Sequence, residues 1–179
     1  MHPRSGIIAP VRDALAPGER PVHWVGSSKR DFLSFPEKVK DAMGNALGIA
    51  QFGGTRPRRG TTRPCMANRS ADRDDEVTHG TSNVFADLGY PDSTERQARL
   101  RLALALNRVL DERTLTQAEV AKLLGVSQPK VSALRNYKLA GFSVERLMTF
   151  LTALDRDVRI VIRQKPRSRR SARISVEAA

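Results

Sequence analysis

Five polar residues stand close together in the C-terminal half of the chain: Gln128, Lys130, Ser132, Arg135 and Asn136. Their amide, ammonium, hydroxyl and guanidinium groups can hydrogen-bond to the edges of bases and to phosphate oxygens. The whole chain of 179 residues carries 31 Lys and Arg against 19 Asp and Glu, a formal net charge of +12 at pH 7. Because cations that neutralise phosphates release condensed counterions, nucleic acid is the favoured class of partner.

Two short helices joined by a tight turn are expected to carry these residues. Thr116 and Glu119 have the spacing of a capping box, which starts a helix at Gln117 by satisfying two free backbone donors. We expect this helix to run to Leu124, because Gly125 has no Cβ and can adopt the left-handed backbone of a tight turn. Local signals therefore bound the first helix at both ends.

The second helix is expected to begin after Ser127, an N-cap residue, and Pro129 is tolerated in its first turn because the missing N–H has no helical partner there. If the two helices cross steeply, six apolar residues face inward: Val120, Ala121, Leu124, Val126, Val131 and Leu134. This combination is typical of a helix-turn-helix that enters the major groove of DNA. An ordinary helical hairpin is the alternative interpretation.

The docking geometry of such a motif assigns roles to its polar residues. The N-terminal part of the second helix meets base edges, which assigns readout to Gln128, Lys130 and Ser132. Gln128 can pair bidentately with adenine, and Lys130 can reach guanine. Arg135 is expected at a base or a phosphate, and Gln117 presents its amide to a phosphate. The complete predicted DNA-binding set is Gln117, Ser127, Gln128, Lys130, Ser132, Arg135 and Asn136.

Composition and periodicity divide the chain into five regions. Residues 1–21 and 165–179 are expected to be a disordered leader and a basic disordered tail, because neither has apolar periodicity. Residues 55–81 are rich in Gly, Arg, Thr and Pro, as in a flexible linker. Residues 22–54 predict one strand followed by two helices, and residues 82–164 predict the helix-turn-helix domain. The single strand has no partner within its own region.

The sequence contains few residues that could support a function other than nucleic-acid binding. One cysteine and three scattered histidines exclude a disulfide framework and imply no metal site, and we expect no cofactor and no enzyme. Charged residues interrupt the most apolar stretch, 98–110, which excludes a membrane span. The first 20 residues lack the apolar segment of a secretory signal, so a cytoplasmic protein is expected.

A half-buried strand is predicted at 157–163, where Val158, Ile160 and Ile162 alternate with the residues between them. A lone strand needs a partner to complete its backbone hydrogen bonds. Pairing across a two-fold axis would supply that partner and make a homodimer. Packing of the strand onto the helices of its own chain is the alternative.

From Asn83 to Arg163 the chain resembles the Xre/HigA-type antitoxins, the DNA-binding halves of bacterial toxin–antitoxin pairs. The matching segments are SNVFADLG, LTQAEVA, VSQPKVS and GFSVERL. The resemblance implies a mainly α fold, with a five-helix, lambda-repressor-like helix-turn-helix domain and a C-terminal β-strand. It also implies a homodimeric repressor that binds an operator palindrome in double-stranded DNA, autoregulates its operon and has a cognate RelE/HigB-type toxin as partner.

The N-terminal region carries a second resemblance. Trp24–Phe32 and Phe35–Val39 are similar to the opening of RelE/HigB-type toxins, which are mRNA-cleaving ribonucleases. The sheet and the basic catalytic residues of those toxins do not follow, so 22–54 is interpreted as a truncated toxin remnant. A chance pair of helices, in which Trp24 and the phenylalanines are local core, is the alternative.

Three functions are consistent with these observations. The first is a sequence-specific transcriptional repressor that is the antitoxin component of a type II toxin–antitoxin system. The second is a module that sequesters a toxin through 84–110 with little specific DNA binding, although the apolar residues 84–88 could equally fold back on the domain. The third is a degenerate mRNA endonuclease, which requires catalytic groups on a sheet that the sequence does not contain.

Overall fold

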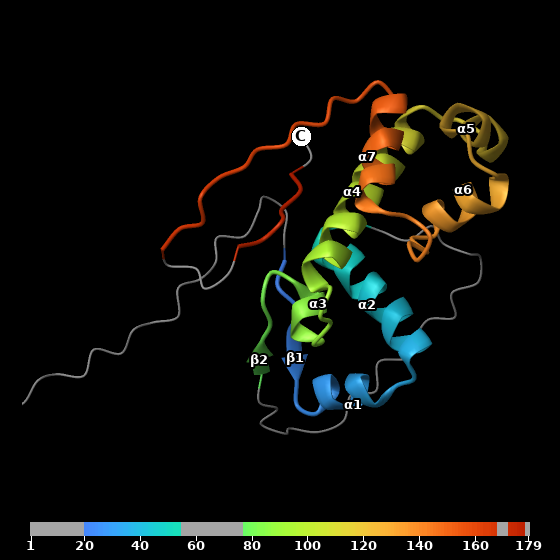
Figure 1. Ribbon diagram of the computed structural model, residues 1–179. Coiled ribbons are helices and arrows are strands. Elements are labelled where there is room, and N and C mark those ends of the chain that lie inside the picture. The colour runs from blue at the N-terminus through green and yellow to red at the C-terminus, as the bar shows by residue number, and fades with distance from the viewer. Residues whose placement is uncertain (1–19, 55–76, 168–171, 178–179) are drawn as a thin grey trace, which may run out of the picture.

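The computed structural model describes residues 20–54, 77–167 and 172–177. Within those residues the chain forms seven helices and two short strands, in the order β1 (His23–Val25), α1 (Ser28–Ser34), α2 (Glu37–Gln51), β2 (Val77–His79), α3 (Val84–Asp87), α4 (Ser93–Glu112), α5 (Gln117–Leu124), α6 (Gln128–Arg135) and α7 (Val144–Ala153). The fold is mainly helical, as predicted (Figure 1). The five helices expected between 82 and 164 are α3 to α7.

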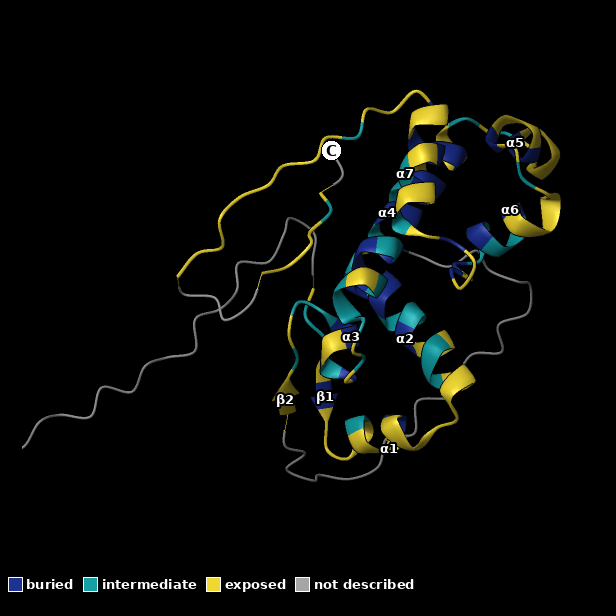
Figure 2. Cartoon of the chain, in the orientation of Figure 1, coloured by how far each residue is buried: buried dark blue, intermediate teal, exposed yellow. Residues whose placement is uncertain are grey.

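Helix α4 is the central helix of this fold. Its apolar residues recur on more than one face, and Leu100, Leu106 and Leu110 are fully buried. Helices α2, α3, α6 and α7 all pack against α4. Figure 2 shows buried residues along α4, where it lies among these helices. None of the described helices combines the length and the apolar character needed to cross a membrane.

Helix α3 is an apolar arm that folds back onto the domain. The side chain of Asn83 caps it by accepting hydrogen bonds from the N–H groups of Phe85, at 3.0 Å, and Ala86, at 3.4 Å. Val84 and Phe85 are each only 1% exposed. Their side chains belong to the core and are not available to a partner protein, so the fold-back alternative describes 84–88.

The N-terminal unit, defined here as residues 20–54 together with β2, shares the core of the helix-turn-helix domain. Its strand and two helices lie where the sequence predicted them. Trp24, Phe32 and Ile49 belong to the same buried cluster as the leucines of α4. Gly48 allows α2 to approach α4 closely, because a Cβ there would lie 2.5 Å from Cδ2 of Leu100. Trp24 and Phe32 are therefore core residues, whereas Phe35 is exposed.

The partner of β1 is β2, which lies inside the region 55–81 that was predicted to be a flexible linker. The two strands are antiparallel, with Trp24 opposite Thr78. Beyond them, the N–H of Thr81 bonds to the carboxylate of Asp87 at 2.9 Å, and Nε2 of Gln51 bonds to the carbonyl of Thr81 at 3.2 Å. The linker prediction is wrong for 77–81, because long-range hydrogen bonds fix a segment too short and too polar to predict as a strand. Residues 55–76, and residues 1–19 of the predicted leader, lie outside the described residues.

The strand predicted at 157–163 is not formed within the single chain. The backbone there has no strand pairing, and Ile160 and Ile162 are 72% and 94% exposed. A lone strand leaves its backbone N–H and C=O groups without partners, and among the described residues no other strand of the same chain lies beside this segment. The described part of the predicted basic tail contacts the helices, since Nη1 of Arg101 donates to the carbonyl of Val176 at 3.0 Å and the Val176 side chain packs against the core.

A polar cluster fixes α2 against the start of α4. The hydroxyl of Tyr90 donates to Oδ1 of Asp41 at 3.0 Å, and Nη1 of Arg96 lies 2.9 Å from the same oxygen. The guanidinium of Arg96 also lies over the Tyr90 ring, 4.2 Å from its centroid. Burial, and then the hydrogen bond to Asp41, raise the pKa of Tyr90 from 10.0 to about 12.

This cluster predicts that the N-terminal unit loosens at high pH. Because the folded state raises the pKa of Tyr90, the neutral phenol contributes stability that is fully present below pH 10.0 and is lost as the pH rises through about 12. Ultraviolet absorbance should show a late-ionising tyrosine, and circular dichroism should show stability falling over the same range. Tyr90→Phe should remove that fall, and an unchanged pH dependence in this variant would contradict the assignment.

Candidate nucleic-acid interface

The first helix of the predicted motif, α5, is capped as the sequence indicates. Oγ1 of Thr116 accepts a hydrogen bond from the N–H of Glu119 at 3.3 Å, and Oε2 of Glu119 accepts from the N–H of Thr116 at 2.8 Å. Hydrogen bonds from the Thr116 side chain and backbone lower the pKa of Glu119 below its ordinary value. The capping box is confirmed, and α5 has the predicted bounds.

The turn between α5 and α6 has the left-handed geometry that the sequence predicts. Gly125 has a φ of 62°, and the N–H of Val126 returns to the carbonyl of Ala121 at 3.0 Å. Ser127 is the N-cap of α6, but its hydroxyl makes no cap hydrogen bond. Its backbone carbonyl accepts a hydrogen bond from the N–H of Lys130 at 2.9 Å. The Ser127 side chain is exposed on the surface.

The inward face of the motif is formed by the six apolar residues named from the sequence. Five of them are buried and Val126 is half-buried. A hydrogen bond from α4 fixes the far end of α6, because Nδ2 of Asn107 donates to the carbonyl of Leu134 at 3.2 Å. The two helices thus form a rigid unit whose opposite face is turned outward.

The outward face carries the predicted DNA-binding residues in two groups. Exposed side chains are those of Gln117, Ser127, Gln128 and Lys130, and half-buried side chains are those of Ser132, Arg135 and Asn136. The exposed group lies at or near the N-termini of α5 and α6. Free backbone N–H groups at helix N-termini favour anions such as phosphates. The structure therefore leaves the first group accessible on the surface.

The half-buried residues have partners inside the protein. Arg135 forms an ion pair with Asp111 at the end of α4. Nδ2 of Asn136 donates to the carbonyl of Ser132 at 2.7 Å. Sequence reasoning missed Asp111, because its meeting with Arg135 depends on how α4 packs against α6. Arg135 is thus held in one orientation at the edge of the outward face.

The sequence of the turn, of α6 and of the loop after it is basic. Between residues 120 and 144 the sequence contains no Asp or Glu and four cations: Lys122, Lys130, Arg135 and Lys138. Lys138, which follows α6 and is exposed, was absent from the predicted set. The acid-free run of sequence is the signal that could have found it. A surface of this kind attracts the phosphate backbone of nucleic acid.

Comparisons with known proteins agree with this geometry. A family model described as "Helix-turn-helix domain" matches residues 84–163, which contain α3 to α7. A solved structure named "Putative XRE Family Transcriptional Regulator" is 71% identical, with 50% of this chain and 100% of that chain covered and a TM-score of 0.48. The identity over the whole of that chain decides the family. The chain belongs to the XRE family of helix-turn-helix proteins.

The XRE helix-turn-helix consists of α5 and α6, and α4 and α7 support it. The matched domain begins at 84, after the N-terminal unit. The comparisons do not show the toxin resemblance of 22–54. A search of curated proteins finds no match to this chain.

Proposed function

We propose that this protein is a sequence-specific DNA-binding transcriptional repressor that inserts α6 into the major groove of an operator. The observation that carries the proposal is the outward face of α6, which presents exposed Gln128 and Lys130 from a run of sequence without acidic residues. The 71% identity of half of this chain to a protein named as a putative XRE-family transcriptional regulator supports the same function.

The proposed contacts follow from the position of each residue. Gln128 and Lys130 lie on the first turn of α6, where side chains reach base edges. Ser132 is one turn farther on and half-buried, which suits a contact near the edge of the groove. Gln117 and Ser127 lie at helix N-termini and are assigned to phosphates on either side. Arg135 and Asn136 are assigned to the backbone at the far end of α6.

The proposal is tested by selection from a pool of random duplexes with the full-length protein. Bound DNA is recovered over several rounds and sequenced. A common sequence with two-fold symmetry is expected, because a dimeric repressor reads two half-sites about one helical turn apart. Recovery of unrelated sequences, bound no better than the starting pool, would contradict sequence-specific recognition.

We infer further that two copies pair through residues 157–163. Ile160 and Ile162 are the most exposed large apolar residues described in the chain, at 72% and 94%. Alternation places Val158 with them on one face of an extended segment. Figure 1 shows this segment running away from α5 and α6, so antiparallel pairing of two such segments would leave both recognition helices uncovered.

Replacing both Ile160 and Ile162 with lysine should convert the dimer to a monomer. Each lysine would bring a charge to the paired apolar face, and sedimentation should show the mass of one chain instead of two. Val161→Lys is the matched control, because Val161 lies on the opposite face of the alternation, and this variant should remain dimeric. The proposed pairing would be contradicted if the wild-type protein is a monomer, or if the double variant is still a dimer.

The antitoxin role is proposed on the resemblance of the domain to Xre/HigA-type proteins. Its partner would be a RelE/HigB-type toxin, and it would contact exposed residues, because the apolar side chains of α3 are buried. Affinity capture with this protein from cells that express a toxin gene of the same operon tests the role. Recovery of that toxin in a stable complex is expected. A toxin that remains free and active in the presence of excess protein would exclude the role.

A further inference from the structure

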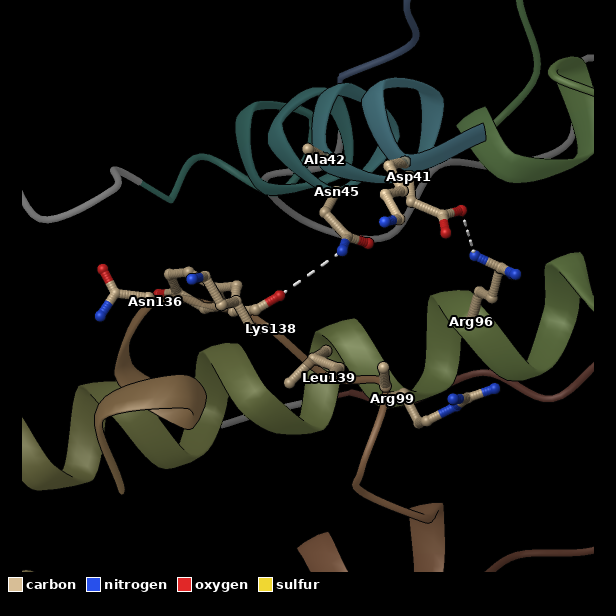
Figure 3. A pocket seen from close by; sticks show the side chains of 11 residues that line it. Asp41, Ala42, Asn45, Arg96, Arg99, Asn136, Lys138 and Leu139 are labelled. Carbon is tan, nitrogen blue, oxygen red and sulfur yellow. Dashed lines mark hydrogen bonds and ion pairs between the residues drawn. The ribbon is translucent and has the colours of Figure 1, made fainter. Parts of the chain in front are cut away.

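A cleft of about 720 Å³ lies where the N-terminal unit meets the end of α6. Its walls come from α2, from α4 and from the loop that joins α6 to α7. Figure 3 shows Asn136 and Lys138 on the loop side and the paired Asp41 and Arg96 farther along the cleft. The cleft is therefore continuous with the recognition helix, because Asn136 is both its lining residue and the C-cap of α6.

The lining of this cleft is strongly basic. Four cations line it, from three different elements: Lys38, Arg96, Arg99 and Lys138. Asp41 is the single carboxylate in the lining, and it is already bound by Arg96 and by the hydroxyl of Tyr90. Arg99 is paired with Glu95 at 3.2 Å. Among the described residues no carboxylate lies within ion-pair distance of Lys38 or Lys138.

The two free ammonium groups are carried by parts of the chain that are held together. Nδ2 of Asn45, on α2, donates to the carbonyl of Tyr137 at 3.5 Å, and Tyr137 is buried. The ion pair between Arg96 and Asp41 fixes α2 to α4 on the other side of the cleft. Lys38 and Lys138 thus line the same cleft from two parts of the chain that other contacts hold together.

The position of the cleft indicates which anion it receives. A duplex whose major groove contains α6 has its sugar–phosphate backbone beside the ends of that helix. Asn136 and Lys138 extend α6 directly into the cleft, so a phosphodiester that follows the helix end enters the basic space. A free inorganic or nucleotide phosphate shares the chemistry, but nothing encloses it, since the exposed Lys38 and Lys138 leave the cleft open to solvent.

We propose that this cleft binds a backbone phosphate of the operator, with Lys38 of α2 on one side and Lys138 on the other. The N-terminal unit is then part of the DNA-binding surface and extends the footprint of the helix-turn-helix beyond α6. The inference rests on the proposed function, because it takes the same duplex as ligand. It adds a contact from a region of the chain that precedes the matched domain.

The test is the salt dependence of binding by the full-length protein and by Lys38→Gln, with duplex enriched from a random pool as probe. Loss of one phosphate contact should lower the slope of log affinity against log salt by about 0.9. The preference for the enriched duplex over a scrambled one should stay unchanged. Lys40→Gln is the matched control on the same helix, because Lys40 does not line the cleft, and its slope should equal that of the wild type.

A double variant of Lys38 and Lys138 sharpens the test. If both lysines bind one phosphate, the slope of the double variant should fall less than the sum of the two single changes. A wild-type slope in Lys38→Gln would overturn the inference and leave the proposed function intact. Stabilisation by inorganic phosphate that Lys38→Gln abolishes, with the DNA slope unchanged, would overturn it in favour of a small-anion site. Absence of any duplex preference in the wild type would overturn both proposals.

Discussion

Replacing Lys130 with alanine is expected to cost about 1–3 kcal/mol in binding to the operator and much less in binding to a scrambled duplex. Lys130 is exposed on the first turn of α6, and no ion pair holds it among the described residues. A base contact discriminates between sequences, whereas a phosphate contact does not. The affinity ratio between the two duplexes, measured by mobility-shift titration, should therefore fall by roughly tenfold to a hundredfold.

Lys122→Ala is the control for this prediction. Lys122 is an exposed lysine on the last turn of α5, so its removal changes the net charge equally but leaves the first turn of α6 intact. Affinity for both duplexes should fall by similar factors, and their ratio should stay constant. If Lys130→Ala behaves in the same way as Lys122→Ala, the assignment of Lys130 to base readout is wrong.

Replacing Leu134 with alanine should destabilise the protein by about 2–5 kcal/mol, the usual cost of deleting a buried leucine side chain. Leu134 is 1% exposed, and its carbonyl accepts the hydrogen bond from Asn107 that fixes the end of α6. The cavity would loosen α6 against α4, and DNA binding should weaken although no DNA-facing group is changed. Urea denaturation gives the free energy of unfolding.

Leu123→Ala provides the same chemical change on the surface of α5. Leu123 is 44% exposed, so its truncation should change the free energy of unfolding by about 1 kcal/mol or less. Equal costs for the two substitutions would show that α6 is not anchored through Leu134, contrary to the packing described for the motif.

The helix-turn-helix could be predicted in detail because its signals are local. The capping box of Thr116 and Glu119 sets the start of α5, and Gly125 sets its end through a conformation that other residues rarely adopt. The inward apolar residues follow from the 3.6-residue period once those bounds are fixed. Nothing beyond about ten residues of context is needed for any of these signals.

Features that depend on distant segments could not be predicted in the same way. The pairing of β1 with β2 joins residues such as Trp24 and Thr78, which the sequence separates by a polar stretch. A strand of three residues with an exposed, polar composition has no periodicity to detect. The ion pair of Arg135 with Asp111 likewise depends on the packing of α4 against α6.

The segment 157–163 shows a third reason why sequence alone predicts a structure incompletely. Its alternation of Val158, Ile160 and Ile162 indicates a strand, but alternation identifies a face and not the partner that covers it. Within the single chain Val158 packs against the core, whereas Ile160 and Ile162 are exposed. Alternation alone therefore does not identify what covers Ile160 and Ile162, and the proposed dimer supplies a second copy of the same segment.

The central claim is that α6 reads a base sequence, and the affinity ratio of the wild-type protein tests it most directly. Mobility-shift titrations with the enriched duplex and a scrambled duplex of equal length should be made at one physiological salt concentration. Sequence-specific readout predicts an enriched duplex bound at least about a thousandfold more tightly. Equal affinities for the two duplexes would mean that the basic surface binds DNA through phosphates alone, and would contradict the proposed function.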